Sequence, residues 1–234
     1  MKNFVFYLNS RGDGYADTDN CKCPPCCYQV ETEMASDIAT ELAKQFGYSL
    51  NVSGLSGYGQ PGNSGEPFPL KWGEVIPLHF IKALNRSKTI ILSHPSRRYT
   101  EDVQMIPELL DLGYRLCKYL EDLKETVIIV ISADLAHTHS KDGPYGYSNT
   151  SEPFDRACGL WAQTLDGSSL LVTAAGYVDR ALSCGFTGLV MLHGALSQEG
   201  LSSWNPKLFA IHHPSYYGMM AASFRKRKTV FDCV

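Results

Sequence analysis

The sequence predicts a single α/β domain in which a mainly parallel central sheet is covered by helices on both faces. Two observations lead to this prediction. Short, continuous apolar runs have the composition of strands buried on both faces, and helix-like amphipathic stretches alternate with such runs along the chain. The predicted strands are 89–93 (TIILS), 126–132 (TVIIVIS) and 188–192 (GLVML). The predicted covering helices are 103–123, 154–165 and 170–182.

The N-terminal part of the chain adds a strand, two loops and a helix to this pattern. The apolar and aromatic run 3–8 (NFVFYL) predicts a strand. Residues 10–29 are rich in Gly, Asp, Cys and Pro, which predicts an irregular loop insertion, and 31–46 has a helical periodicity that ends at Gly47. The glycine-rich segment 53–67 has no periodicity and predicts a second loop.

Composition favours a soluble protein with a substantial core. The chain has 234 residues, of which 44% are hydrophobic and 19% charged. Its net charge of -3 gives no general attraction to nucleic acid, and the basic cluster Arg225–Lys228 is expected to cap or follow a helix. No apolar run reaches the ~18 to 20 residues that span a bilayer, and the first ten residues are too polar for a signal peptide. We therefore expect a cytoplasmic protein with reduced cysteines and no membrane or nucleic-acid partner.

Half of the eight cysteines lie in the short segment CKCPPCC, and this density suggests a metal site. Cys21, Cys23, Cys26 and Cys27 carry soft ligand atoms that suit zinc or copper. Their spacing does not match a standard zinc finger, and the segment lies inside the predicted loop insertion. A soft-metal loop and a loosely constrained insertion both stay open.

The segment 127–155 (VIIVISADLAHTHSKDGPYGYSNTSEPFD) is the strongest candidate for a functional site. A predicted buried strand ends in it and delivers Asp134, His137 and His139 to a polar, glycine-rich loop. Functional groups gather at such strand ends, and an imidazole pKa near 6.5 suits proton transfer at neutral pH. The alternative is structural: Asp134 orients an imidazole or caps the loop, and His139 either supports the site without touching its reactants or is a solvated loop residue.

Four motifs in order resemble the class III extradiol ring-cleavage dioxygenases, represented by the protocatechuate 4,5-dioxygenase B subunit and by Memo proteins. The segment SADLAH, followed by GPYGYS and EPFD, is similar to the G-D-L-S-H segment of that family. The resemblance covers about residues 30 to 224 and implies one dioxygenase-like domain over 1–234. The other matching motifs are FPLKWGEVIPLHFI (68–81), ALSCGFTGLVMLHGAL (181–196) and HPSYYGMMAASF (213–224).

The resemblance implies a cofactor, substrates and roles for three residues. In the dioxygenases, Fe(II) held by two histidines and a carboxylate binds a catechol and then dioxygen. His137 is then the acid/base catalyst, or a metal ligand as in some branches, with Asp134 beside it. Memo-type members have a Cys-Gly pair where the dioxygenases have their glutamate ligand, and Cys184 with Gly185 matches that pair. Cys184 is then a ligand for iron, zinc or copper, or else a small buried apolar residue.

Further imidazole and aromatic side chains are weaker candidates for the same site. His193, in LHGAL, is predicted to end an apolar strand at the same rim of the sheet as His137, and it is a third candidate catalytic residue. Tyr145, Tyr147 and Tyr216 either stack on an aromatic substrate or anchor their loops.

Two features depart from the family pattern. The first strand of the family and two of its ligand histidines correspond to positions ahead of Met1, so we expect both ligands to be missing from these 234 residues. Trp72 stands where the dioxygenases have a histidine that grips a substrate hydroxyl, and an indole cannot act as a base. His79, seven residues later, is expected to be a packing or surface residue.

Three functions stay open at this stage. The first is an Fe(II)-dependent extradiol dioxygenase that acts on a catechol-type aromatic and dioxygen, and that is inactive if its other ligands are absent. The second is a Memo-like metal-binding regulatory protein without ring-cleavage activity. The third is a paralogue that acts through homo-oligomerisation, because a missing strand would expose a sheet edge.

Overall fold

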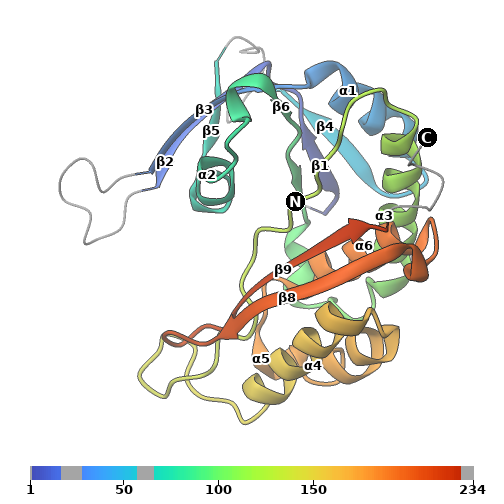
Figure 1. Ribbon diagram of the computed structural model, residues 1–234. Helices are drawn as coiled ribbons and strands as arrows, with labels where there is room; N and C mark the ends of the chain where they lie inside the picture. Colours follow the sequence, from blue (N-terminus) through green and yellow to red (C-terminus); the bar gives the residue numbers. More distant parts are fainter. Residues whose placement is uncertain (1, 17–27, 57–65, 228–234) are drawn as a thin grey trace. The chain divides into compact units, whose positions relative to one another are not determined.

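The computed structural model describes residues 2–16, 28–56 and 66–227, and it divides the chain into two compact units (Figure 1). The first unit is Met1–Ser96 and the second is Arg97–Val234. Each unit has its own sheets and helices. Within the described residues, no helix has both the length and the apolar character that crossing a bilayer would require.

The first unit contains two small mixed sheets. One has the strand order β4-β1-β7 (β4, Val52–Leu55; β1, Phe4–Tyr7; β7, Leu92–Ser93), with β1 parallel to β4 and antiparallel to β7. The other has the order β5-β2-β3-β6 (β5, Phe68–Leu70; β2, Arg11–Ala16; β3, Tyr28–Met34; β6, Lys88–Thr89), with β2 antiparallel to β3. The helices of this unit are α1 (Ser36–Phe46), α2 (Trp72–His79) and the 3-10 turn η1 (Leu84–Arg86).

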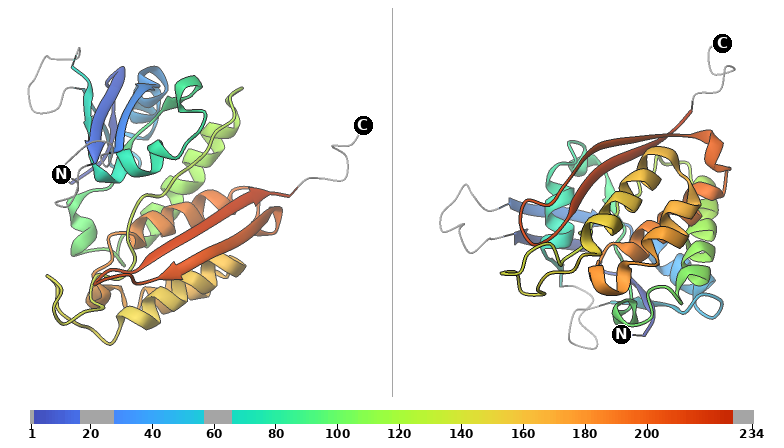
Figure 2. Two further views of the ribbon diagram at one scale, coloured as in Figure 1. Left: turned by 60° about the vertical axis from the view of Figure 1, so that its left-hand side comes forward. Right: turned by 90° about the horizontal axis from the view of Figure 1, so that it is seen from below.

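The second unit is mostly helical and ends in a long β-hairpin. The hairpin strands run alongside α4 (Figure 2). They are β8 (Trp204–His212) and β9 (Met219–Lys226), and they pair antiparallel. The helices are α3 (Ile106–Glu121), α4 (Ser151–Thr164), α5 (Val178–Ala181) and α6 (Phe186–Ser197). Shorter turns are η2 (Ser96–Tyr99), the π-helical η3 (Ser169–Ala174) and η4 (Leu201–Ser203).

Two glycines allow α3 and α6 to pack with their backbones in close contact. A Cβ on Gly113 of α3 would overlap the carbonyl oxygen of Met191 in α6. Reciprocally, a Cβ on Gly194 of α6 would overlap the carbonyl oxygen of Leu110 in α3. Because glycine has no Cβ, it permits this approach. The α3–α6 contact therefore depends on the absence of two side chains.

The predicted single parallel sheet is wrong, because the described strands form three small sheets that each contain an antiparallel pair. The run 188–192 lies within helix α6. That helix is apolar on all sides, with Phe186 to Met191 buried, so it has no amphipathic period that would distinguish it from a buried strand. The run 126–132 forms no strand in the structure. A β-branched composition favours extended backbone but does not supply a neighbouring strand.

Other elements agree with their predictions in part. The strand at 3–8 and the helices at 103–123 and 154–165 are confirmed as β1, α3 and α4. The helix predicted at 31–46 begins only at Ser36, because 28–34 forms β3 with Val30, Thr32 and Met34 buried in alternation. The loop predicted at 10–29 contains strand β2, and the four cysteines of CKCPPCC lie outside the described residues. Arg225 and Lys226 belong to strand β9 rather than to a helix end.

The close α3–α6 contact predicts a loss of stability on adding one methyl group. Gly113→Ala should lower the free energy of unfolding by about 1–3 kcal/mol, because the new Cβ must push two helix backbones apart. Urea unfolding followed by circular dichroism measures this loss. Gly176→Ala is the control, since its Cβ would meet only the carbonyl oxygens of Val172 and Thr173, at 3.4 and 3.5 Å. Equal effects of the two substitutions would contradict the packing argument.

Candidate metal centre

The loop that follows residues 126–132 is held on one side by the connection between β8 and β9. Leu135 N–H donates to the carbonyl of Gly218 (2.8 Å), and Gly218 N–H donates back to Ala136 (2.7 Å). His139 N–H donates to the carbonyl of Tyr216 (3.0 Å). These backbone bonds fix the path of residues 135–139 and therefore the places from which their side chains start.

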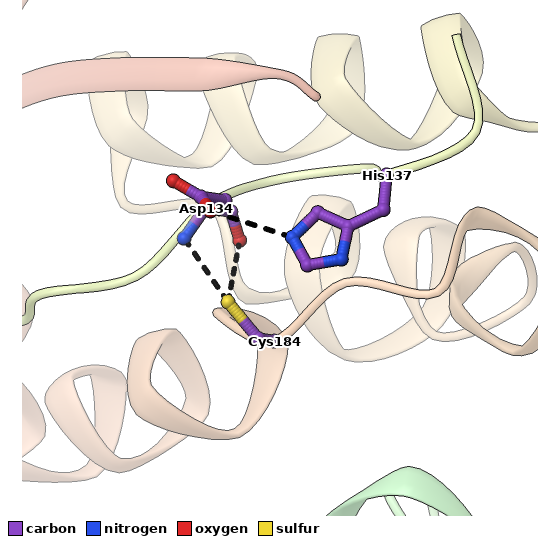
Figure 3. A group of neighbouring side chains, drawn as sticks. All are labelled: Asp134, His137 and Cys184. Atoms are coloured by element: carbon purple, nitrogen blue, oxygen red, sulfur yellow. Dashed lines mark hydrogen bonds and ion pairs between the residues drawn. The ribbon is translucent and has the colours of Figure 1, made fainter. Parts of the chain in front are cut away.

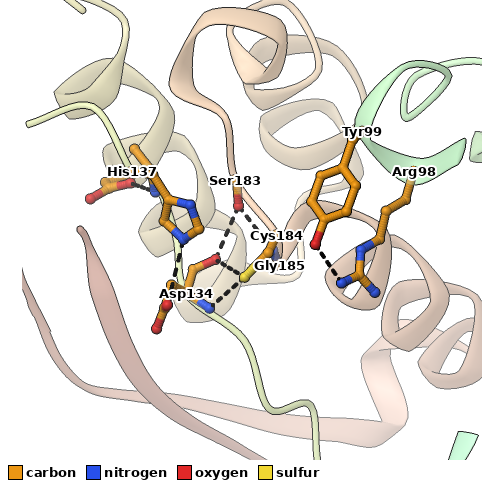
Figure 4. A network of polar contacts seen from close by, with 9 residues as sticks. Arg98, Tyr99, Asp134, His137, Ser183, Cys184 and Gly185 are labelled. Carbon is orange, nitrogen blue, oxygen red and sulfur yellow. Dashed lines mark hydrogen bonds and ion pairs between the residues drawn. The ribbon is translucent and has the colours of Figure 1, made fainter. Parts of the chain in front are cut away.

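A second segment, 181–185, approaches the same loop from the other side (Figure 4). His137 N–H donates to the carbonyl of Ala181 (2.8 Å), and the Ser183 hydroxyl donates to the carbonyl of Asp134 (3.1 Å). A Cβ on Gly185 would lie 2.6 Å from that same carbonyl oxygen, so glycine is required where the chain turns into α6. This approach brings Cys184 to Asp134, fifty residues away in sequence.

Asp134, His137 and Cys184 form a compact group of ligand-type side chains (Figure 3). One ligand atom from each lies within 4.8 Å of the other two. His137 Nε2 is 3.5 Å from Asp134 Oδ2, and the Asp134 backbone N–H donates to Cys184 Sγ (3.2 Å). All three residues are half-buried, and they are the single group of this kind among the residues that the structure describes.

The His137 imidazole has a buried nitrogen that lacks a hydrogen-bond partner. Nε2 is inaccessible, and its 3.5 Å contact with Asp134 is an ion-pair distance without hydrogen-bond geometry. The Asp134 carboxylate, followed by Cys184, nevertheless raises the pKa of His137 from 6.5 to about 9, against the opposing effect of burial. In the metal-free protein at neutral pH, the imidazole is therefore mainly protonated.

A buried carboxylate, Asp155 of α4, binds this loop at two points. Its Oδ1 accepts the backbone N–H of Ala136 (2.9 Å), and its Oδ2 is 2.8 Å from His139 Nε2. Burial raises the pKa of Asp155, while these contacts oppose the rise. The exposed imidazole of His213 stacks on His139, with centroids 4.4 Å apart. His139 is thus a paired structural residue and not a solvated one.

The structure brings two of the three predicted catalytic residues together and separates the third. His193 lies in helix α6 rather than at a strand end, and it is buried. Its Nδ1 accepts the indole N–H of Trp161 (3.0 Å), and burial lowers its pKa, so the ring is neutral and structural. The catalytic role suggested for His193 is therefore replaced by a packing role.

The structure also places the aromatic candidates and His79. Tyr145 stacks on His137, whereas the ring of Tyr147 is exposed and is not among the described ring contacts. Trp72 begins helix α2 of the first unit and is half-exposed, and His79 ends that helix and packs on Tyr28.

Sequence reasoning missed the supporting residues of the centre. Asp155 was visible only as the last letter of EPFD, and Ser183 carried no signal of its own.

Two further cysteines of this unit are unsuited to bind metal. Cys117 and Cys158 are buried, and desolvation raises the pKa of both thiols, to about 11 for Cys117.

Comparisons with known proteins add one relative. No protein-family model matches the chain. This chain is 33% identical to Protein CA_C1420 of Clostridium acetobutylicum over 129 residues, which is 54% of the chain. The matched region is 26% of that protein, so the chain spans about a quarter of this relative's length. The name of this relative states no activity, and the resemblance to extradiol dioxygenases stays a prediction.

The buried Asp155 predicts a large cost for removing its carboxylate. Asp155→Ala should lower the free energy of unfolding by about 3–5 kcal/mol, because the Ala136 N–H and the His139 imidazole both lose their partner. Chemical denaturation measures the change. Asp142→Ala, an exposed aspartate of the neighbouring loop, is the control and should stay within about 0.5 kcal/mol of wild type. A similar small effect at Asp155 would refute its supporting role.

The raised pKa of His137 predicts a pH dependence in the metal-free protein. NMR titration of the His137 ring should give a pKa of about 9, and Asp134→Asn should move it back towards 6.5. Because the folded value lies above the unfolded one, the charged ring stabilises the fold fully below pH 6.5, and this stabilisation is lost as the pH rises through about 9. A wild-type pKa near 6.5 would contradict the ion pair.

Proposed function

We propose that this protein binds a transition-metal ion through His137 Nε2, Cys184 Sγ and a carboxylate oxygen of Asp134. The observation that carries the proposal is the buried Nε2 without a hydrogen-bond partner, which faces two further ligand-type atoms within 4.8 Å. Buried polar groups in native structures are almost always satisfied. A metal ion would satisfy this nitrogen and balance the charges of the carboxylate and the thiolate.

The donor set determines which ions suit the group. A thiolate and an imidazole favour zinc, Fe(II) or copper, whereas magnesium and calcium prefer oxygen ligands alone. Three protein ligands leave at least one coordination position for a water molecule or a substrate, as in catalytic zinc sites. A bound ion would supply a Lewis acid and, for iron or copper, a redox centre.

For the activity, we propose Fe(II)-dependent extradiol cleavage of a catechol-type aromatic with dioxygen. The support is the resemblance of SADLAH and the three other motifs to the dioxygenase family. Each residue of the centre would have one role. His137, Cys184 and Asp134 would hold the ion. Asp155 would keep the loop that carries Asp134 and His137 in place.

A second candidate function is metal binding without ring cleavage, as in a Memo-like regulatory protein. Cys184 favours it, since a thiolate stands where the dioxygenases have a glutamate ligand. A thiolate is a softer donor than a carboxylate and suits zinc and copper as well as iron.

Metal titration tests the proposal that both candidates share. Wild-type protein should bind one Co²⁺ or Zn²⁺ ion at this group, besides any ion held by CKCPPCC, and His137→Gln and Cys184→Ser should each weaken binding at this group by more than ~100-fold, the upper range for loss of an outer-shell contact. Since binding must displace the His137 proton, the affinity should rise as the pH increases towards 9. His212→Gln, which changes an exposed histidine outside the group, is the control. Equal affinities for wild type and Cys184→Ser would reject the site.

Oxygen uptake separates the two candidates. Protein loaded with Fe(II) under anaerobic conditions is mixed with a panel of catechols and then with dioxygen. Stoichiometric uptake with a ring-opened product supports the dioxygenase. Tight metal binding without uptake or product supports the binding protein and excludes extradiol cleavage by this chain.

A further inference from the structure

The loop between His139 and Tyr147 is closed on itself. These two residues form an antiparallel bridge, so the ends of the loop are held together. Inside it, Gly143 N–H donates to the carbonyl of Ser140 (3.2 Å), and Gly146 N–H donates to the carbonyl of Gly143 (3.1 Å). The consecutive turns bring Tyr145 back over the candidate metal ligand that precedes the loop. Its position is set by backbone bonds and not by burial.

Tyr145 stacks on the His137 imidazole. The ring centroids are 5.4 Å apart and the planes differ by 26°. The ring centroid of Tyr145 also lies 6.1 Å from that of Tyr216, and the carbonyl of Tyr216 accepts the N–H of His139. Tyr145 is nevertheless 54% exposed, so it contributes little to a hydrophobic core. The contact of this half-exposed tyrosine with His137 therefore restricts the orientation of the imidazole more than it stabilises the fold.

The polar contacts described for the His137 side chain, which is 16% exposed, do not include a close hydrogen bond from its ring. Its Nε2 has no hydrogen-bond partner, and its contact with Asp134 is 3.5 Å long. The second torsion of a histidine side chain has broad minima, so the backbone position alone does not determine where Nε2 points. Metal-ligating imidazoles are normally oriented by contacts outside the ligand set. Stacking on Tyr145 is the ring contact described for His137 that can do this.

We propose that Tyr145 is a positioning residue, which holds the His137 ring with Nε2 directed at Asp134 and Cys184. The orientation itself is a property of the metal-free protein. Its consequence for metal affinity rests on the proposed metal-binding function. The phenol oxygen has no part in the proposal, because the stacking uses the ring face. Tyr145→Phe should therefore preserve the orientation of the His137 ring, whereas Tyr145→Ala should not.

The experiment compares Tyr145→Ala and Tyr145→Phe with Tyr147→Ala as the matched control. Tyr147 lies on the same loop and is 59% exposed, close to the 54% of Tyr145, but its ring is not described in contact with His137. Co²⁺ is the probe, since the part of the thiolate-to-cobalt absorption that Cys184→Ser removes reports on Cys184 and on the geometry of the site. Tyr145→Ala should bind Co²⁺ ~10-fold more weakly and with an altered absorption spectrum. Tyr145→Phe and Tyr147→Ala should match wild type, and all four proteins should have the same thermal midpoint.

A second measurement judges the proposal without metal. In metal-free wild type and in Tyr145→Phe, the NMR signals of the His137 ring should be sharp and shifted by the adjacent aromatic ring. In Tyr145→Ala they should broaden or move to averaged positions. Unchanged ring order in Tyr145→Ala would overturn the proposal, as would equal Co²⁺ affinity and spectrum for that variant and wild type. If wild type binds no Co²⁺, the proposed function fails, and the ring order alone then decides the role of Tyr145.

Discussion

The candidate centre depends on one buried carboxylate. Asp155 connects helix α4 to the loop before it, through the Ala136 N–H and the His139 imidazole. An ionised carboxylate in a low-dielectric interior is costly unless charged or polar groups satisfy it. Asp155 has two such partners, and both belong to the loop that carries Asp134 and His137. Its desolvation cost is therefore offset only while that loop keeps its native path.

Two segments hydrogen-bond to this loop and bring the ligand-type side chains together. The β8–β9 connection binds residues 135–139 through backbone hydrogen bonds, and the segment 181–185 binds the loop through Ala181 and Ser183. The backbone that carries these side chains is already fixed, so an ion bound there would not have to order the loop. Such preorganisation reduces the entropy lost on binding.

Much of the site could be predicted from sequence, but much of the fold could not. Asp134 and His137 are candidates because their chemistry is visible in the residue types of one segment, whereas Cys184 is a candidate only through the family resemblance. Their meeting across fifty residues was implied only by a family resemblance. His193 was misplaced because a helix that is buried on all sides has the same apolar composition as a buried strand. The role of Asp155 was not visible, because a buried carboxylate has the same letter as an exposed one.

The long sequence separation within the centre has a consequence for folding. Asp134 meets Cys184 and Leu135 meets Gly218, so the loops closed by these contacts are tens of residues long. Closing such loops costs chain entropy before any contact rewards it, and contacts of this kind slow folding. The centre therefore assembles only when the segment from 134 to 218 has come together. An ion that binds the assembled centre and not the unfolded chain would stabilise this whole unit, in proportion to the logarithm of its concentration.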